Sequence, residues 1–202
     1  MSMTRMTRSE SQAQTRAHLI ATARDLFLAN GYGVTSLEKV AEEAGYSKGA
    51  VYSNFRNKKE LCLEVLQLIH ATKGSEIAEV MARPVPLEER LIAFEDWAER
   101  TLGDVEWTML EFEFIAATRH DPELRTALAT NLSSTHHIVQ AVLGALVASG
   151  EVTLPMSVED ATTSVLSFGV GLGIQRAIDP TISTSVITRN LRALLGGSGD
   201  GP

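Results

Sequence analysis

Two short helices joined by a tight turn are predicted within residues 35–61, and the rest of the chain must fold so as to hold them. The first helix is indicated by apolar residues at positions i, i+3, i+4 and i+7, which are Leu37, Val40, Ala41 and Ala44. Gly45 then stands where a left-handed C-cap ends a helix. Ser47 can cap a second helix that runs to about Phe55, with Val51 and Phe55 one turn apart on its inner side. The pattern is that of a helix-turn-helix.

Further helices are predicted on both sides of this motif. An apolar stripe over residues 14–30, ended by Asn30 and Gly31, predicts a helix that supports the motif from its N-terminal side. Asn57 is placed to cap the helix that follows, and Glu60 has the spacing to reach back to it in a capping box. The helices before Asn57 would form a small three-helix head.

The outer face of the second helix of the motif carries the side chains that a DNA-reading helix needs. A major groove admits one α-helix, whose N-terminal donors and acceptors read base edges. Gly49 would let the backbone approach closely, and Tyr52 offers a hydroxyl to phosphate or a ring to a thymine methyl. Hydroxyls and cations near helix N-termini favour phosphate. The predicted base readers are Lys48, Ser53 and Asn54, and the predicted phosphate contacts are Thr35, Ser36, Ser47, Lys58 and Lys59.

The run from Ala44 to Leu61, AGYSKGAVYSNFRNKKEL, resembles the DNA-binding signature of the tetracycline-repressor (TetR) family of bacterial one-component regulators. That signature is roughly A-G-V-S-x-G-T-L-Y-x-H-F-x-S-K-x-x-L, and the similarity extends without gaps over about residues 16–64. Tyr46, Ala50 and Asn54 depart from it and stand where valine, threonine and histidine are usual. Ala50 and Asn54 lie on or near the reading face. The resemblance therefore implies DNA binding, with Ala50 among the contact residues, but does not indicate which operator sequence is read.

The net charge of −7 would by itself argue against nucleic acid, but the charge is unevenly distributed. Residues 1–60 carry nine Lys and Arg against six Asp and Glu, whereas the remainder carries nine against nineteen. The basic charge is therefore concentrated at the predicted DNA-binding end. An acidic remainder would discourage nonspecific binding of DNA through the wrong surface.

Helical periodicity continues through the rest of the 202 residues, and no stretch alternates apolar and polar residues over the length of a strand. Prolines and glycines divide it into segments. The helices predicted after the head cover residues 58–81, 87–102, a segment from 105 to 121, 122–149, 158–178 and 182–195. The predicted fold is all-α, with about nine helices that form a three-helix head on a larger helical body.

Four regions are predicted along the chain. Residues 1–12 form a disordered arm, 13–60 the helix-turn-helix DNA-binding domain, 61–195 a ligand-binding and dimerisation domain, and 196–202 a flexible tail. The single cysteine, Cys62, allows no disulfide framework and no cysteine zinc site within a chain. No run of 18 apolar residues occurs, and the first ten residues lack the apolar segment of a signal peptide. We therefore expect a soluble cytoplasmic protein without a membrane partner.

No catalytic or metal site is predicted. His136 and His137 are adjacent on a helix, so they point about 100° apart and lack the i, i+4 spacing of a helical metal site. Cys62 follows a helix start that could lower a thiol pKa, but without a paired residue a packing role is the simpler interpretation. The G-x-G-x-G run at 169–173 has no strand before it, which argues against a dinucleotide loop and favours close helix packing. We expect neither an enzyme nor a cofactor.

The stretch from Asp104 to Phe114 interleaves carboxylates with aromatic rings. Such a mixture suits a planar or cationic ligand in an apolar pocket, but it also fits a solvated acidic edge with aromatic residues in the core. Glu111 and Phe112 in addition resemble a common family sequence, which weakens an inference specific to a ligand. The candidate ligand-lining residues are Phe94, Trp97, Trp107, Leu110, Phe114, His137 and Phe168.

The TetR resemblance implies a homodimer that binds double-stranded DNA at a palindromic operator. In that family the last two helices form a four-helix dimer interface, and GLGIQRAIDP at 171–180 resembles the family sequence there. The family's body holds a small-molecule inducer that widens the spacing of the two heads, so the expected function is a repressor released from its operator by a ligand. Two alternatives stay open: a DNA-binding protein of the same fold without ligand sensing, and a helical ligand-binding protein with a vestigial DNA-binding head.

Overall fold

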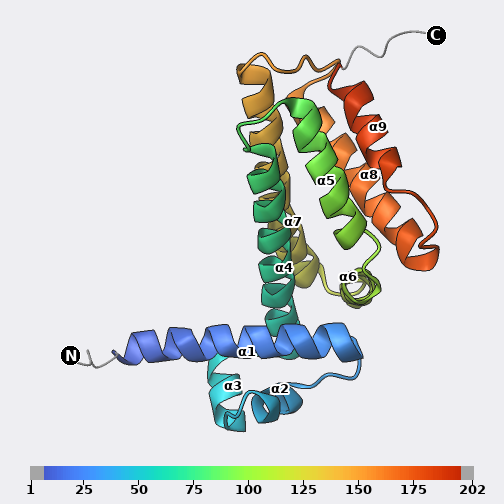
Figure 1. Ribbon diagram of the computed structural model, residues 1–202. Helices are drawn as coiled ribbons and strands as arrows, with labels where there is room; N and C mark the ends of the chain where they lie inside the picture. The colour runs from blue at the N-terminus through green and yellow to red at the C-terminus, as the bar shows by residue number, and fades with distance from the viewer. Residues whose placement is uncertain (1–6, 197–202) are drawn as a thin grey trace. The chain divides into compact units, whose positions relative to one another are not determined.

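The computed structural model describes residues 7–196, and within them the chain forms nine α-helices and no β-strand (Figure 1). The helices are α1 (Arg8–Asn30), α2 (Leu37–Glu43), α3 (Lys48–Asn54), α4 (Lys58–Met81), α5 (Leu87–Thr101), α6 (Val105–Ala117), α7 (Pro122–Ala148), α8 (Val158–Ile178) and α9 (Ser185–Leu194). The all-α prediction is confirmed. Residues 1–6 and 197–202, which include parts of the predicted arm and tail, lie outside the described residues. None of the helices described is both long and apolar enough to span a bilayer.

By compactness the chain divides into two units. The first contains the described residues up to Leu68 together with Met109–Leu128, and the second contains Ile69–Thr108 and the described residues from Ala129 onward. The division passes through α4, α6 and α7, so each of these helices contributes to both units. The functional boundary that the sequence predicts after residue 60 stays a prediction.

Helix α1 begins at Arg8, six residues before the start that its apolar stripe predicts, and it includes residues 8–12 of the predicted arm. A capping box accounts for the difference. The Thr7 hydroxyl accepts the backbone N–H of Glu10 at 3.2 Å, and the Glu10 carboxylate accepts the backbone N–H of Thr7 at 2.6 Å. Two donors at the helix start are thereby satisfied, and a helical turn without apolar residues becomes stable.

Two serine caps and one glycine set the bounds of α2 and α3. Ser36 Oγ accepts the backbone N–H of Lys39 at 3.1 Å. Ser47 Oγ accepts the backbone N–H of Ala50 at 3.2 Å, as the sequence predicts. Gly45 has a φ of +72° at the end of α2, in the left-handed region where a Cβ would be strained.

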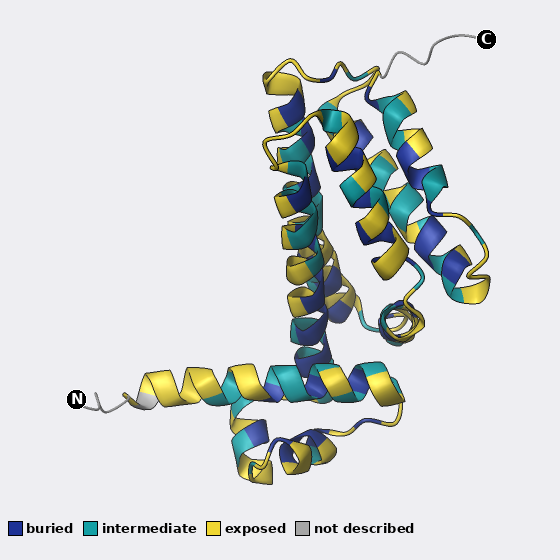
Figure 2. Cartoon of the chain, viewed as in Figure 1, coloured by how far each residue is buried: buried dark blue, intermediate teal, exposed yellow. Residues whose placement is uncertain are grey.

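The core of the first unit includes apolar side chains of α1 to α4. Figure 2 shows buried positions along each of these helices. Its most buried members include Leu19, Ala23, Phe27, Val40, Ala41, Val51, Phe55, Leu61 and Val65. Val51 and Phe55, which the helical spacing places on the inner side of the motif, are 0% and 1% exposed. Their burial fixes which side of α3 faces outward.

The start of α4 differs in one detail from the predicted capping box. Asn57 Oδ1 accepts the backbone N–H of Glu60 at 2.9 Å, as expected of a cap. The Glu60 carboxylate, however, accepts the backbone N–H of Arg56 at 2.9 Å and not that of Asn57. The Arg56 guanidinium donates to the same carboxylate oxygen at 3.1 Å, and this pair draws Glu60 past the cap residue.

Two hydrophobic clusters form the core of the second unit. One joins α4, α5, α8 and α9 through Val80, Phe94, Trp97, Ala98, Leu102, Leu172 and Ile187. The other contains Leu91, Val139, Leu143, Leu146, Val152, Ala161 and Leu195. Helix α9 therefore packs with both α5 and α8 (Figure 1).

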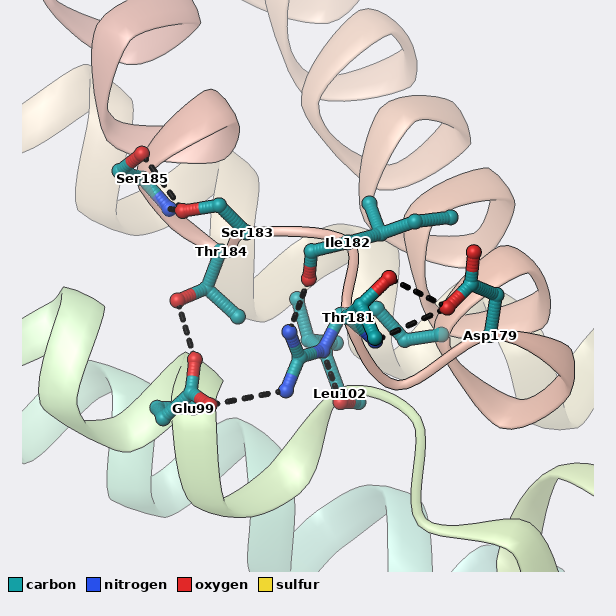
Figure 3. A network of polar contacts seen from close by, with 9 residues as sticks. Glu99, Leu102, Asp179, Thr181, Ile182, Ser183, Thr184 and Ser185 are labelled. Carbon is teal, nitrogen blue, oxygen red and sulfur yellow. Dashed lines mark hydrogen bonds and ion pairs between the residues drawn. The ribbon is translucent and has the colours of Figure 1, made fainter.

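A polar network ties the end of α5 to the connection between α8 and α9 (Figure 3). The Arg176 side chain is buried, and its guanidinium pairs with the Glu99 carboxylate at 3.0 Å and donates to the Ile182 carbonyl. Glu99 also accepts the Thr184 hydroxyl at 2.5 Å. These contacts hold the connection as a turn, so α9 begins at Ser185, three residues later than the sequence predicts.

Candidate nucleic-acid interface

The outer face of α3 presents an exposed row of residues, as predicted. These residues are Lys48, Gly49, Tyr52 and Ser53. Among the described residues, a Cβ built on Gly49 would meet only Ser47 Oγ within 4 Å, at 3.8 Å. Gly49 is therefore not required for packing inside the head, and its missing side chain leaves room for another molecule.

Tyr52 and Glu38 connect α3 to α2 on this surface. The Tyr52 hydroxyl donates to Glu38 Oε1 at 2.7 Å. This hydrogen bond raises the pKa of Tyr52 and holds the pKa of Glu38 below its ordinary value. A hydroxyl has one proton to donate, so the predicted phosphate contact requires Tyr52 to exchange Glu38 for a phosphate oxygen. The exposed ring remains free for a thymine methyl.

Ser53 and Asn54 turn their side chains back onto their own helix. Ser53 Oγ donates to the Ala50 carbonyl at 2.9 Å, and Asn54 Nδ2 donates to the same oxygen at 2.8 Å. Ser53 is exposed, whereas Asn54 and Ala50 are half-buried. Base reading by Asn54 thus requires a change of rotamer, while Ser53 keeps acceptor capacity toward the groove.

Thr35 lies inside the head, which corrects its prediction as a phosphate contact. The residue is 1% exposed, and its hydroxyl hydrogen bonds to the carbonyls of Gly31 at 3.0 Å and Leu26 at 3.3 Å. Its side chain closes the connection between α1 and α2. Ser36, the next residue, is exposed at the start of α2 and remains available at the surface.

Lys58 and Glu113 hold the connection between α1 and α2 from two sides. The Lys58 ammonium donates to the carbonyls of Tyr32 at 2.8 Å and Gly33 at 3.1 Å, and it lies 4.4 Å from the centroid of the Tyr32 ring. The Glu113 carboxylate accepts the backbone N–H groups of the same two residues, at 2.6 and 3.3 Å. Burial raises the pKa of Tyr32 to about 12. Lys58 therefore has a structural role in addition to its predicted contact with phosphate.

Glu113 and Asp121 support the candidate interface through contacts that the sequence did not predict. Lys59 pairs with Asp121 at 2.7 Å, and this hydrogen bond lowers the pKa of the Asp121 carboxyl. Both acidic residues belong to the first unit and fix its helices to one another. No local pattern could have found them, because Glu113 reaches a loop 81 residues away in sequence.

The residues predicted to line a ligand site are divided between the two units, and their role stays a prediction. Leu110 and Phe114 are buried in the first unit, whereas the other five belong to the second. Phe94 and Trp97 stack with ring centroids 5.4 Å apart inside a hydrophobic cluster. His137 is exposed, and its place in a ligand site stays a prediction.

Phe168 packs against the cluster that holds Phe94 and Trp97, and it also lines a groove of about 160 Å³ on α8 and α9. Its neighbours along the groove are Ser164, Val165, Ile187, Asn190, Leu191 and Leu194. Cys62 is fully buried, and burial raises the pKa of its thiol, which agrees with a packing role. Among residues 7–196 no three acidic, histidine or cysteine side chains are grouped so as to hold a metal ion.

Comparison with known proteins gives the same assignment for both ends of the chain. The model of the TetR family of bacterial regulatory proteins matches residues 19–65, and that of the C-terminal region of BetI-type transcriptional repressors matches residues 88–197. The regulator AcrR of Shigella flexneri is 36% identical over 81 residues, 40% of this chain and 37% of that protein. The regulator TtgR of Pseudomonas putida is 41% identical over 70 residues, 35% of this chain and 33% of that protein. These matches span about a third of the relatives' own length.

A longer match and two solved structures extend the comparison to most of the chain. CymR of Pseudomonas putida is 26% identical over 151 residues, 74% of each protein. The reduced form of Escherichia coli NemR has a TM-score of 0.73 at 16% identity, covering 90% of this chain and 97% of that one. FadR of Bacillus subtilis, in complex with stearoyl-CoA, has a TM-score of 0.68 at 18% identity, covering 91% and 99%. The helix-turn-helix geometry and the two family matches together show that the chain belongs to the TetR family of bacterial regulatory proteins.

Proposed function

We propose that this protein is a ligand-responsive transcriptional regulator, a homodimeric repressor that leaves a palindromic operator when a small molecule binds. The observation that carries the proposal is the exposed outer face of α3 in a head of TetR type. Ser36 caps the start of α2 and Ser47 caps the start of α3. A single α-helix such as α3 fits into a major groove of DNA. Lys48 and Ser53 would read base edges, while Ser36, Ser47 and Lys58 would contact phosphates.

The dimer would form through α8 and α9. Val170 and Ile178 on α8 are 60% and 76% exposed, and large apolar side chains exposed in a row favour a partner. A Cβ built on Gly169 or Gly171 would meet no described atom within 4 Å, so these glycines leave space for a second helix. Two copies would present two α3 helices to successive major grooves, as a palindromic operator requires.

Ligand release would follow from a population shift. The ligand must bind the arrangement that does not fit DNA more tightly than the arrangement that does, and each 1.4 kcal/mol of difference changes operator affinity about tenfold. The structural neighbour FadR holds stearoyl-CoA, which shows that this fold accommodates a small molecule. The shared fold supports a ligand site in this chain without naming its ligand.

The test is a fluorescence-anisotropy titration of the full chain against DNA from upstream of its own gene, at low and moderate salt, with scrambled DNA of equal length as control. We expect tight, sequence-selective binding whose logarithm falls with the logarithm of salt by about 0.9 per phosphate contact. Binding no tighter than to scrambled DNA anywhere in that region would contradict the proposal and favour a ligand-binding protein with a vestigial head.

A further inference from the structure

Among the buried side-chain polar atoms of the second unit, the indole nitrogen of Trp107 on α6 and the hydroxyl of Thr135 on α7 have no hydrogen-bond partner among the described residues. An indole N–H only donates, so it must find an acceptor oxygen or nitrogen. Leaving a buried donor unpaired costs about 1–3 kcal/mol, and buried polar groups without a partner are uncommon enough to require an explanation.

A lysine lies beside the Trp107 ring. The ammonium of Lys73 on α4 is 5.9 Å from the ring centroid and 3.9 Å from Glu76 Oε2. The Glu76 carboxylate oxygen already accepts the indole N–H of Trp97, at 2.8 Å. Trp97 and Trp107 thus differ: the first has a carboxylate partner, and the second faces an ammonium and has none.

Helix packing brings Thr135 to the same region of the second unit. A Cβ on Gly74 would lie 2.7 Å from Ile138 Cδ1, so α4 and α7 approach each other closely at this point. Thr135 is one turn before Ile138 on the same face of α7, and Lys73 directly precedes Gly74. His136 points elsewhere, to Thr163 on α8 at 3.2 Å. Thr135 and Lys73 therefore belong to the parts of α7 and α4 that approach each other.

We propose that Lys73, Trp107 and Thr135 form the subsite that recognises the head group of the effector, and that this head group is a carboxylate on an apolar body. The lysine and the indole can only donate, and the hydroxyl can donate a third hydrogen bond. A carboxylate offers several lone pairs and a negative charge, and hydrogen bonds between charged groups are the stronger ones. The inference rests on the proposed function only in calling this ligand the effector.

Fluorescence tests the site directly, because the chain contains two tryptophans. In the full-length Trp97→Phe variant, emission reports on Trp107 alone. The probes are octanoate and cyclohexanecarboxylate, each compared with its neutral primary amide. We expect a saturable change in emission with both carboxylates, and binding at least about tenfold weaker for the amides.

Side-chain variants, each made in the Trp97→Phe chain, then identify the residues. Lys73→Met and Thr135→Val should each weaken carboxylate binding at least about fivefold, with Lys73→Met also removing the preference over the amide. Thr163→Val is the matched control, since it removes a threonine hydroxyl from α8 and should leave binding unchanged. Thermal melts of every variant confirm that the fold is retained.

The outcomes separate this inference from the proposed function. Absence of a saturable response to either carboxylate, equal affinity for acid and amide, or insensitivity to Lys73→Met overturns the carboxylate subsite. These titrations contain no DNA, so failure of operator binding leaves their result intact. Selective operator binding with no carboxylate response would leave the regulator proposal standing and remove only the subsite.

Discussion

Ser47 caps α3 and also lies on the proposed DNA surface, and a substitution by aspartate separates these two roles. Its hydroxyl caps α3 by accepting the Ala50 N–H, and the residue is exposed on the proposed DNA surface. Ser47→Ala should destabilise the fold by about 1 kcal/mol through loss of the cap. Ser47→Asp keeps a capping oxygen but adds a negative charge opposite phosphate, so it should unfold like the wild type and yet bind operator at least about tenfold more weakly.

Urea unfolding and operator anisotropy measure the two effects independently. Ser157→Ala, which removes the cap of α8 in the second unit, is the control for loss of a cap without DNA contact. A Ser47→Asp variant that binds operator as well as the wild type would place this residue away from the phosphate backbone.

Lys58 also serves both the fold and the proposed interface. Two of its three N–H donors go to the Tyr32 and Gly33 carbonyls, which leaves one for a phosphate. Lys58→Gln should lower the urea midpoint, weaken binding to every DNA sequence, and reduce the magnitude of the salt slope by about 0.9 per subunit contact.

Lys59→Gln is the control for Lys58, because the Lys59 ammonium is engaged by Asp121. It should leave the salt slope unchanged. If Lys58→Gln lowers stability but does not alter the slope, Lys58 acts only by holding the connection between α1 and α2.

At the scale of helices, Glu99 makes the junction of α5 with α8 and α9 dependent on pH. The Thr184 hydroxyl and then the Arg176 guanidinium hold its pKa below the ordinary value of 4.5. A carboxyl whose pKa is lower in the folded state stabilises the fold above its unfolded pKa, and this contribution is lost as pH falls through the folded value. Glu99→Gln should therefore be less stable than the wild type at pH 7, with the difference shrinking below about pH 4.5.

Urea midpoints of both proteins at several pH values between neutral and acid check this expectation. Glu89→Gln, an exposed position on the same helix, is the matched control. A difference between wild type and Glu99→Gln that stays constant from pH 7 into acid would show that the charge of Glu99 is not what holds this junction.

Individual helices were predictable to the extent that their signals are local. Helix α4 and helix α8 have the predicted bounds, since apolar periodicity runs through each segment and a proline, Pro84 or Pro180, follows shortly after its end. The start of α1 was missed because a capping box, and not apolar periodicity, stabilises its first turn. The burial of Thr35 and the hydrogen bond from the Tyr32 backbone to Glu113 depend on tertiary packing. Local sequence patterns do not reveal such packing.

For the whole molecule, the exposed apolar surface of α8 is the feature on which the proposed dimer depends. Val170 on α8 is 60% exposed, and a second copy would cover it in the proposed dimer. Val170→Asp should leave the fold of one chain intact, because the side chain points to solvent there. In a dimer interface the same carboxylate would be desolvated without a partner, at a cost of several kcal/mol.

Ile92→Asp on α5 is the matched control, since Ile92 is 52% exposed and lies outside the two helices of the proposed dimer interface. Sedimentation equilibrium should show the wild type and Ile92→Asp as dimers, and Val170→Asp dissociating at concentrations at least about tenfold higher. Because two linked heads bind a palindrome far more tightly than one, Val170→Asp should also lose operator affinity while its circular dichroism is unchanged. If this variant stays a dimer, the interface does not include Val170 on α8. The two α3 helices would then be held at a different spacing from the one that the proposed dimer gives them.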